Sequence, residues 1–201
     1  MSKLNILTVP GSERLLSLDS RLNNAGFADY KIYPGEITQI PYYGLFATIK
    51  EVIAENYHTP YCIIAEDDIL PANSFTPQKL SEIITEAAPF NPDIILGGIK
   101  EGSRVTRISK NLLQVHNYRG SQLMVIFQKL YDKILTAKME QELEIMLSHS
   151  DKIIKLVSYP FAAYQANGIS RFLLSTDHLA DYMDFEEKIS TFLKKAKMDN
   201  F

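Results

Sequence analysis

The stretch Tyr61–Asp68, which reads YCIIAEDD, decides the fold class. Its first part, Tyr61–Ala65, is an apolar run without alternation, which is typical of a strand that is covered on both faces. Three carboxyl side chains, those of Glu66, Asp67 and Asp68, follow directly. Because ligands of open α/β sheets bind outside the carboxyl ends of the strands, we expect a functional site at this end.

The chain before this stretch follows the order strand, turn, helix. Leu4–Val9 is a short apolar run that Pro10-Gly11 ends, and leucines then recur at helical spacing over Leu15–Leu22. The pattern predicts a second strand over Tyr30–Tyr33 and a second helix over Leu45–Tyr57. Alternating strands and helices indicate a parallel sheet that is flanked by helices.

The chain after this stretch changes pattern once. Leu80–Ala87 predicts a helix and Asp93–Leu96 a buried strand. Between Arg104 and Phe127, short apolar segments separated by polar residues favour antiparallel strands. The remaining predicted elements are a helix over Leu130–Leu147, a strand over Ile153–Val157 and an amphipathic helix over Asp177–Lys197. We therefore predict an α/β fold with a mixed, mostly parallel sheet, helices on both faces and an antiparallel set in the second half.

The composition limits the class of protein. The 201 residues contain 21 Lys+Arg and 24 Asp+Glu, a net charge of −3, which argues against a protein that works on nucleic acid or on an anionic membrane surface. Hydrophobic residues make up 46%, which is globular, and the one cysteine excludes an intramolecular disulfide. We expect a single domain over residues 1–201 without an integral membrane segment. We also expect a cytoplasmic protein, which a partner could hold at the inner membrane.

The three adjacent carboxylates favour a cation site. They repel one another unless a cation screens them, and oxygen ligands suit magnesium or manganese, which usually also hold substrate phosphates. Since alternate residues of an extended segment point the same way, Glu66 and Asp68 could act together while Asp67 turns aside. The alternative is a turn that Asp67 or Asp68 caps, with the remaining carboxylates as surface charges.

These residues also carry a resemblance to a known family. The segment CIIAEDDILPANSF resembles the LEDD…F core of glycosyltransferase family 25, the lipopolysaccharide-type transferases with a GT-A fold. Other segments are similar to the family in matching order and cover about residues 4–171. They are the opening strand, arginine and helix, Gly44 at the start of the family's GC-x-x-SH, DIILGG, GSQLMVIF at Gly120–Phe127 and YPFAAYQANGIS at Tyr159–Ser170.

The resemblance implies a GT-A-like fold and a function. It implies inverting transfer of a sugar from a nucleotide-sugar donor to a hydroxyl of a glycan or of a lipid-linked, lipopolysaccharide-type acceptor, with manganese or magnesium as cofactor. Asp68 would bind the metal, which bridges the two phosphates of the donor. The donor-binding residues would be Arg14, Glu66, Asp67, Gln165 and Ser170. For Arg14 the alternative is a structural ion pair, with a neighbouring carboxylate or with the acidic triplet itself.

An inverting transferase needs a carboxylate that takes the proton of the acceptor hydroxyl. By position, the resemblance offers Glu140, Glu142 and Glu144, and we select Glu142. On a helix, Glu142 and Glu144 diverge by about two hundred degrees, so only one of them can face a cleft. The alternative is that all three are solvated glutamates on an amphipathic helix.

The sequence also departs from the family pattern. The Cys and Ser-His expected after Gly44 are absent, Arg171 replaces an Asp after Ser170, and MEQELEIML stands where the family has its catalytic Asp. Two other functions therefore stay open. One is an inactive relative that binds a nucleotide-sugar, a glycan or a protein partner. The other is a nucleotidyltransferase, which can also place carboxylates and a metal at the end of a strand.

Overall fold

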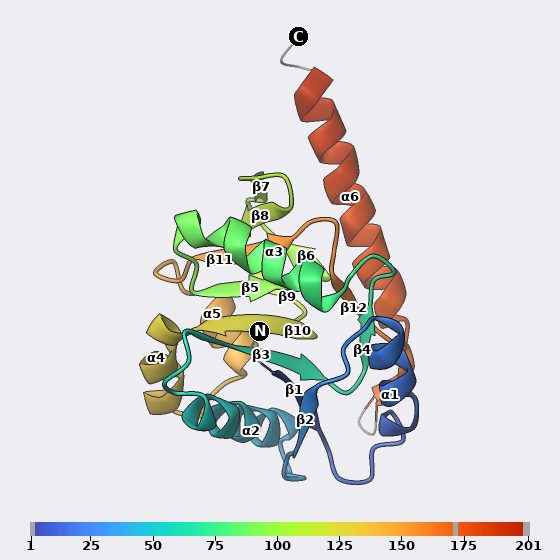
Figure 1. Cartoon of the computed structure of the whole chain (residues 1–201), viewed down its shortest axis with the longest axis vertical. Helices are drawn as coiled ribbons and strands as arrows, with labels where there is room; N and C mark the ends of the chain where they lie inside the picture. Colours follow the sequence, from blue (N-terminus) through green and yellow to red (C-terminus); the bar gives the residue numbers. More distant parts are fainter. Residues whose placement is uncertain (1–2, 171–172, 199–201) are drawn as a thin grey trace.

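A mixed sheet built from the apolar runs forms the centre of the protein (Figure 1). The computed structural model describes residues 3–170 and 173–198. The sheet has eight strands in the order β2-β1-β3-β10-β5-β11-β8-β7. These strands are β1 (Leu4–Thr8), β2 (Tyr30–Pro34), β3 (Tyr61–Glu66), β5 (Ile94–Leu96), β7 (Thr106–Arg107), β8 (Leu112–Val115), β10 (Leu123–Phe127) and β11 (Lys155–Ser158).

Strand directions confirm the predicted mixture. β1 pairs in parallel with β2 and β3, and β5 pairs in parallel with β11. β10 lies antiparallel between β3 and β5, and β8 is antiparallel to both β11 and β7. The reversed strands thus belong to the second half of the chain. The carboxyl ends of β1, β3 and β5 lie at one edge of the sheet.

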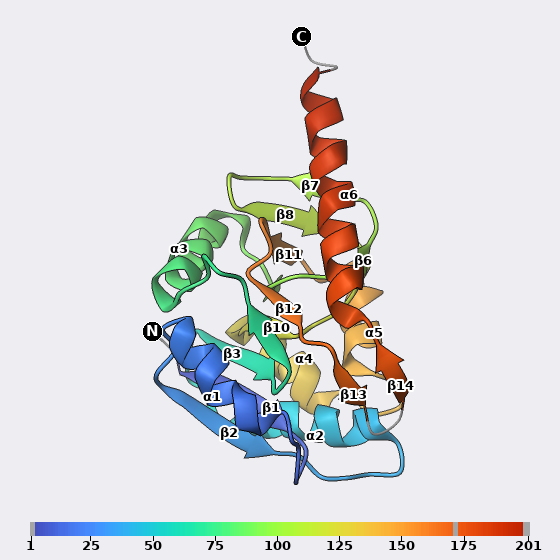
Figure 2. The ribbon, with the colours of Figure 1, turned by 90° about the vertical axis from the view of Figure 1, so that its right-hand side faces the viewer.

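Helices cover both faces of the sheet (Figure 2). They are α1 (Leu15–Asn24), α2 (Pro41–Glu55), α3 (Pro77–Ala87), α4 (Tyr131–Thr136), α5 (Leu143–Ser148) and α6 (His178–Met198), with short 3-10 turns at Ala88–Phe90 and Gln128–Leu130. α1 and α3 pack on one face, while α2, α4 and α5 pack on the other. Alternate side chains of β3 serve the two cores: Cys62 and Ile64 face the α2 side, Ile63 and Ala65 the α1 side.

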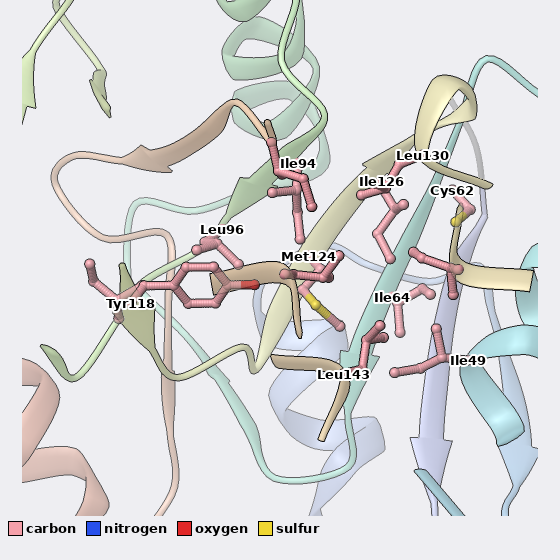
Figure 3. Packing of buried hydrophobic residues seen from close by; sticks show 14 of the residues in the cluster. Ile49, Cys62, Ile64, Ile94, Leu96, Tyr118, Met124, Ile126, Leu130 and Leu143 are labelled. Carbon is pink, nitrogen blue, oxygen red and sulfur yellow. The ribbon is translucent and has the colours of Figure 1, made fainter. Parts of the chain in front are cut away.

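Figure 3 shows the packing on the α2 side. Ile49 of α2 and Leu143 of α5 lie over Ile64 and Met124, which come from the neighbouring strands β3 and β10. Cys62 is completely buried in this cluster, so it serves as a small apolar residue of the core.

The structure also has three short two-stranded ribbons that the sequence did not predict. β4 (Ile69–Pro71) pairs with β12 (Ala163–Gln165), β6 (Glu101–Gly102) with β9 (Tyr118–Arg119), and β13 (Gly168–Ser170) with β14 (Leu173–Thr176). The first of them matters for the site, because it places Gln165 opposite Ile69, just after the acidic triplet.

The predicted helix over Leu130–Leu147 is wrong as a continuous element. The chain is extended at Ala137 and becomes helical again only at Leu143. Residues 138–142 contain one apolar side chain, that of Met139, which is 39% exposed. This stretch has no apolar face to bury against the sheet, so nothing in its packing favours a continued helix.

The terminal helix α6 confirms the prediction for residues 177–197. Tyr182 and Ile189 of its inner part are buried in the core on the α2 side. Its outer part projects beyond the sheet (Figures 1 and 2). Within residues 3–170 and 173–198, no helix is both long and apolar enough to cross a membrane.

Candidate functional site

The acidic triplet lies at the carboxyl end of β3, where the sequence places it. Glu66 is the last residue of the strand, and Asp67 and Asp68 form the turn into β4. The backbone of the turn is tied to both neighbouring strands: the Glu66 N–H donates to the carbonyl of Gln122 at 3.1 Å, and the Asp67 N–H to that of Leu7 at 2.9 Å. The turn is therefore held firmly at the edge of the sheet.

Arg14 pairs with two of the three carboxylates. One of its terminal nitrogens lies 2.8 Å from Asp68 Oδ2 and 3.4 Å from Asp67 Oδ1. The Thr8 hydroxyl donates to Asp67 Oδ2 at 2.6 Å. Strand alternation suggested a pair of Glu66 and Asp68, but the strand ends at Glu66, and the turn brings Asp67 and Asp68 to the same arginine. This arrangement matches the alternative that the sequence left open for Arg14, an ion pair with the acidic triplet.

Arg21 of α1 is a site residue that the sequence analysis missed. Its guanidinium donates to the carbonyls of Asp67 at 2.8 Å, Arg14 at 3.1 Å and Ile69. One side chain thus joins the start of α1 to the acidic turn. The signal was present: Arg21 stands seven residues after Arg14, which places both on one face of the helix that the leucine spacing predicts.

The late segment that resembles the family reaches the acidic turn through β12. Gln165 Nε2 donates to Asp68 Oδ2 at 2.9 Å, and the Ala166 N–H donates to the Asp68 carbonyl at 2.8 Å. The backbone of Ser170 lies in β13, and its side chain is outside the described part of the structure. Four of the predicted residues are therefore linked in one network: Arg14 contacts Asp67 and Asp68, and Asp68 contacts Gln165.

A cavity of about 1010 Å³ opens beside the turn, and Glu66 faces it. Burial and the nearby carboxylates of Asp68, Glu144 and Asp67 raise the pKa of Glu66 to about 8. Burial also raises the pKa of Asp68, which is 2% exposed, although its contacts with Gln165 and Arg14 oppose that rise. Two carboxyl groups at this end of β3 therefore have raised pKa values, as is common at functional sites.

The three candidate bases have different environments. Glu142 is the residue that precedes α5, makes no capping hydrogen bond and lines the cavity. Glu144 also lines it but accepts hydrogen bonds from the Gly120 N–H at 2.9 Å and the Ser121 hydroxyl at 3.2 Å. Glu140 is exposed, and its Oε1 lies 3.7 Å from Lys138 Nζ. Of the three, Glu142 thus lines the cavity without the hydrogen bonds that tie Glu144 to Gly120 and Ser121.

A smaller cavity of about 100 Å³ adjoins the first and shares Glu66 with it. Gly44, at the start of α2, lies in its wall. A Cβ at this position would come within 2.2 Å of the Glu36 carbonyl oxygen, so the close approach of the two backbones requires glycine. This packing explains why Gly44 is present even though the family's Cys and Ser-His do not follow it.

The site offers oxygen ligands but not a complete metal cage. Within residues 3–170 and 173–198, no group of three or more His, Cys, Asp and Glu side chains is arranged to hold a metal ion. Two buried oxygens, Asp68 Oδ1 and Gln165 Oε1, make no hydrogen bond within this part of the chain. Magnesium and manganese often use one or two protein oxygens together with substrate phosphates. The residues present therefore fit an ion that shares its coordination with a bound phosphate.

The sequence matches no protein family model and no curated protein. Solved structures with a similar fold include A197 from STIV, with a TM-score of 0.55, 15% identity, and coverage of 85% of this chain and 87% of that one. HddC from Yersinia pseudotuberculosis complexed with GMP-PN has a TM-score of 0.52 and 13% identity, over 94% of this chain and 100% of that one. At these identities the similarity concerns the fold alone. The expected α/β fold, of the kind found in GT-A glycosyltransferases and nucleotidyltransferases, is confirmed.

Proposed function

We propose that the protein is a glycosyltransferase that uses a nucleotide-sugar donor. The observation that carries the proposal is the acidic triplet at the carboxyl end of β3 in a GT-A-like fold, of which Glu66 lines a cavity of about 1010 Å³. Ligands of such sheets bind at this edge. The complex of HddC with GMP-PN is consistent with a nucleotide as the ligand.

In this proposal Asp68 and Gln165 hold the donor end of the site. Their two unbonded oxygens would bind the divalent ion, manganese or magnesium, together with the donor phosphates. When bound, the ion stabilises negative charge on the departing nucleoside diphosphate. Arg14 and Arg21 keep the turn in shape. Glu66 faces the cavity and contacts the ribose or the sugar. Ser170 is kept as a donor-binding residue on the resemblance alone.

Glu142 is the proposed general base. The acceptor hydroxyl attacks the anomeric carbon, the bond from that carbon to the phosphate oxygen breaks, and the nucleoside diphosphate leaves with the electron pair. The proton of the hydroxyl goes to the carboxylate of Glu142. The resemblance supports a glycan or a lipid-linked, lipopolysaccharide-type acceptor. The proposal keeps the expected cytoplasmic location, where a partner could hold the protein at the inner membrane.

Ligand binding tests the donor proposal. We expect one nucleotide-sugar of a panel of UDP-, GDP-, CMP- and ADP-sugars to raise the melting temperature, and more so with manganese. Asp68→Asn keeps the size of the side chain but removes its charge, so this variant should lose the manganese-dependent shift. Asp29→Asn is the matched control, because Asp29 is exposed and pairs with Lys3 outside the cavity. Equal manganese-dependent shifts of the melting temperature in the wild type, Asp68→Asn and Asp29→Asn would contradict the assignment of the site.

The product separates the alternatives. A glycosyltransferase releases a nucleoside diphosphate from a nucleotide-sugar, whereas a nucleotidyltransferase releases pyrophosphate from a nucleoside triphosphate and a sugar phosphate. Because glycosyltransferases and nucleotidyltransferases share this fold, both products should be assayed. Binding without either product would identify the inactive relative.

A further inference from the structure

A half-buried lysine stands at the same edge of the sheet as the acidic turn. Lys100 follows the carboxyl end of β5, and only β10 separates β5 from β3. Because β3 and β5 run in the same direction, the segments that follow them meet at one edge. Lys100 and Glu66 accordingly line the same cavity.

Lys100 is held in place from three sides. Its backbone N–H donates to the Arg119 carbonyl at 2.7 Å, its Nζ lies 2.9 Å from His178 Nδ1, and Nζ is 5.6 Å from the centre of the Tyr182 ring. An ammonium group has three donors and no acceptor, so it donates to His178, whose ring then accepts at Nδ1. Burial and the positive charge of Lys100 lower the pKa of His178, which favours this neutral form.

Lys100 differs from the other cations of the cavity in its pairing. Arg119 Nε lies 3.4 Å from Glu144 Oε1, and Lys188 Nζ lies 2.5 Å from Asp184 Oδ2. Within residues 3–170 and 173–198, no carboxylate lies within ion-pair distance of Lys100. Burial lowers the pKa of Lys100, and carboxylates such as Glu66 and Asp181 oppose that from beyond ion-pair distance. An anion bound in the cavity would contact the ammonium directly and offset the remaining cost of its burial.

Four of the carboxylates in and beside the cavity are paired with cations, whereas Glu66, Glu101, Glu142 and Asp181 also line it. Arg14 pairs with Asp67 and Asp68, and Arg119 and Lys188 pair with Glu144 and Asp184. The repulsion that these four carboxylates would exert on a phosphate is therefore reduced by cations already in contact with them.

We infer that Lys100, oriented by His178, binds the diphosphate of the nucleotide-sugar. This inference rests on the proposed function and adds a protein cation to the donor site. The ammonium contacts oxygens of the diphosphate opposite the acidic turn. When the bond between the anomeric carbon and the phosphate oxygen breaks, the electron pair stays on the diphosphate, and the positive charge of Lys100 stabilises it there.

Binding of inorganic pyrophosphate in the presence of EDTA tests the inference by calorimetry. We expect Lys100→Met to weaken pyrophosphate binding by about tenfold or more, and Lys100→Arg to restore most of it because the charge is kept. Lys188→Met is the matched control: Lys188 lines the same cavity but is 68% exposed and already paired, so its loss should change the affinity less than about twofold.

The outcomes distinguish this inference from the proposed function. If Lys100→Met and Lys188→Met weaken binding equally, or if neither does, Lys100 is not the anion site. If nucleotide-sugars bind and turn over equally well in the wild type and in Lys100→Met, the inference is wrong and the proposed function stands. If pyrophosphate binding depends on Lys100 but no nucleotide-sugar binds or reacts, the anion site stands and the proposed function is wrong.

Discussion

At the scale of single residues, two arginines of α1 keep a cluster of carboxylates in one conformation. Arg14 pairs with Asp67 and Asp68, and Arg21 binds the backbone of the same turn. The sequence placed Arg14 near the triplet because the carboxyl ends of neighbouring parallel strands meet. It did not identify Arg21 or Lys100, because the pattern does not tell a helix arginine or a loop lysine that is inserted into a site from one on the surface.

Arg14→Met should destabilise the protein before any ligand is added. It leaves two buried aspartates without their cation, and we expect a loss of about 1–3 kcal/mol in the free energy of unfolding. Denaturant titration measures the loss. Adding Asp67→Asn should recover part of it, because one of the uncompensated charges is then removed. An unchanged unfolding midpoint in Arg14→Met would contradict the structural role of Arg14.

At the scale of elements, the break between α4 and α5 decides which glutamate can act. A continuous helix would spread the three candidates around its axis, whereas the break places Glu142 at the start of α5 and at the cavity wall. The sequence predicted the helical segments but not the break, since the apolar spacing resumes at Leu143. The approach of β12 to the acidic turn could not be predicted from local patterns, because it depends on pairing between segments far apart in the sequence; the resemblance alone placed Gln165 in the same site.

Glu142→Gln should lower turnover and spare donor binding. If Glu142 accepts the proton of the acceptor hydroxyl, kcat falls by about 10²–10⁴-fold while the dissociation constant of the donor changes little. Initial rates and calorimetry provide the two numbers. Glu144→Gln provides the comparison: its carboxylate holds Gly120 and Ser121, so this variant should lose stability as well. Equal losses of kcat and donor affinity in Glu142→Gln would assign Glu142 a binding or structural role.

The inner part of α6 belongs to the core, and its outer face does not. Ile189→Ala should cost about 2–5 kcal/mol, because Ile189 is 4% exposed and packs against the core on the α2 side. Met183→Ala, on the same helix at 57% exposure, should change the free energy of unfolding by less than about 0.5 kcal/mol. Thermal or urea unfolding of both variants checks the difference. Similar losses would mean that α6 packs differently from the structure described.

At the scale of the whole molecule, the sheet explains why distant residues share one cavity. Glu66 follows β3, Lys100 follows β5, and Glu142 precedes α5 on the covered face, so the fold brings three separate segments to one wall. Strand type and most strand and helix positions could be predicted, because buried runs and helical spacing are local signals. The order of the strands could not, because the insertion of β10 between β3 and β5 depends on contacts over long sequence separations.

The central claim is that this cavity transfers a sugar from a nucleotide-sugar. The most direct measurement incubates the protein with manganese and the nucleotide-sugar that stabilises it, with water or an added glycan as acceptor, and follows the release of nucleoside diphosphate. We predict release by the wild type and by Asp29→Asn, and a loss of release in Asp68→Asn. Release of pyrophosphate from a nucleoside triphosphate and a sugar phosphate instead, or the same release of nucleoside diphosphate by Asp68→Asn, would contradict the claim.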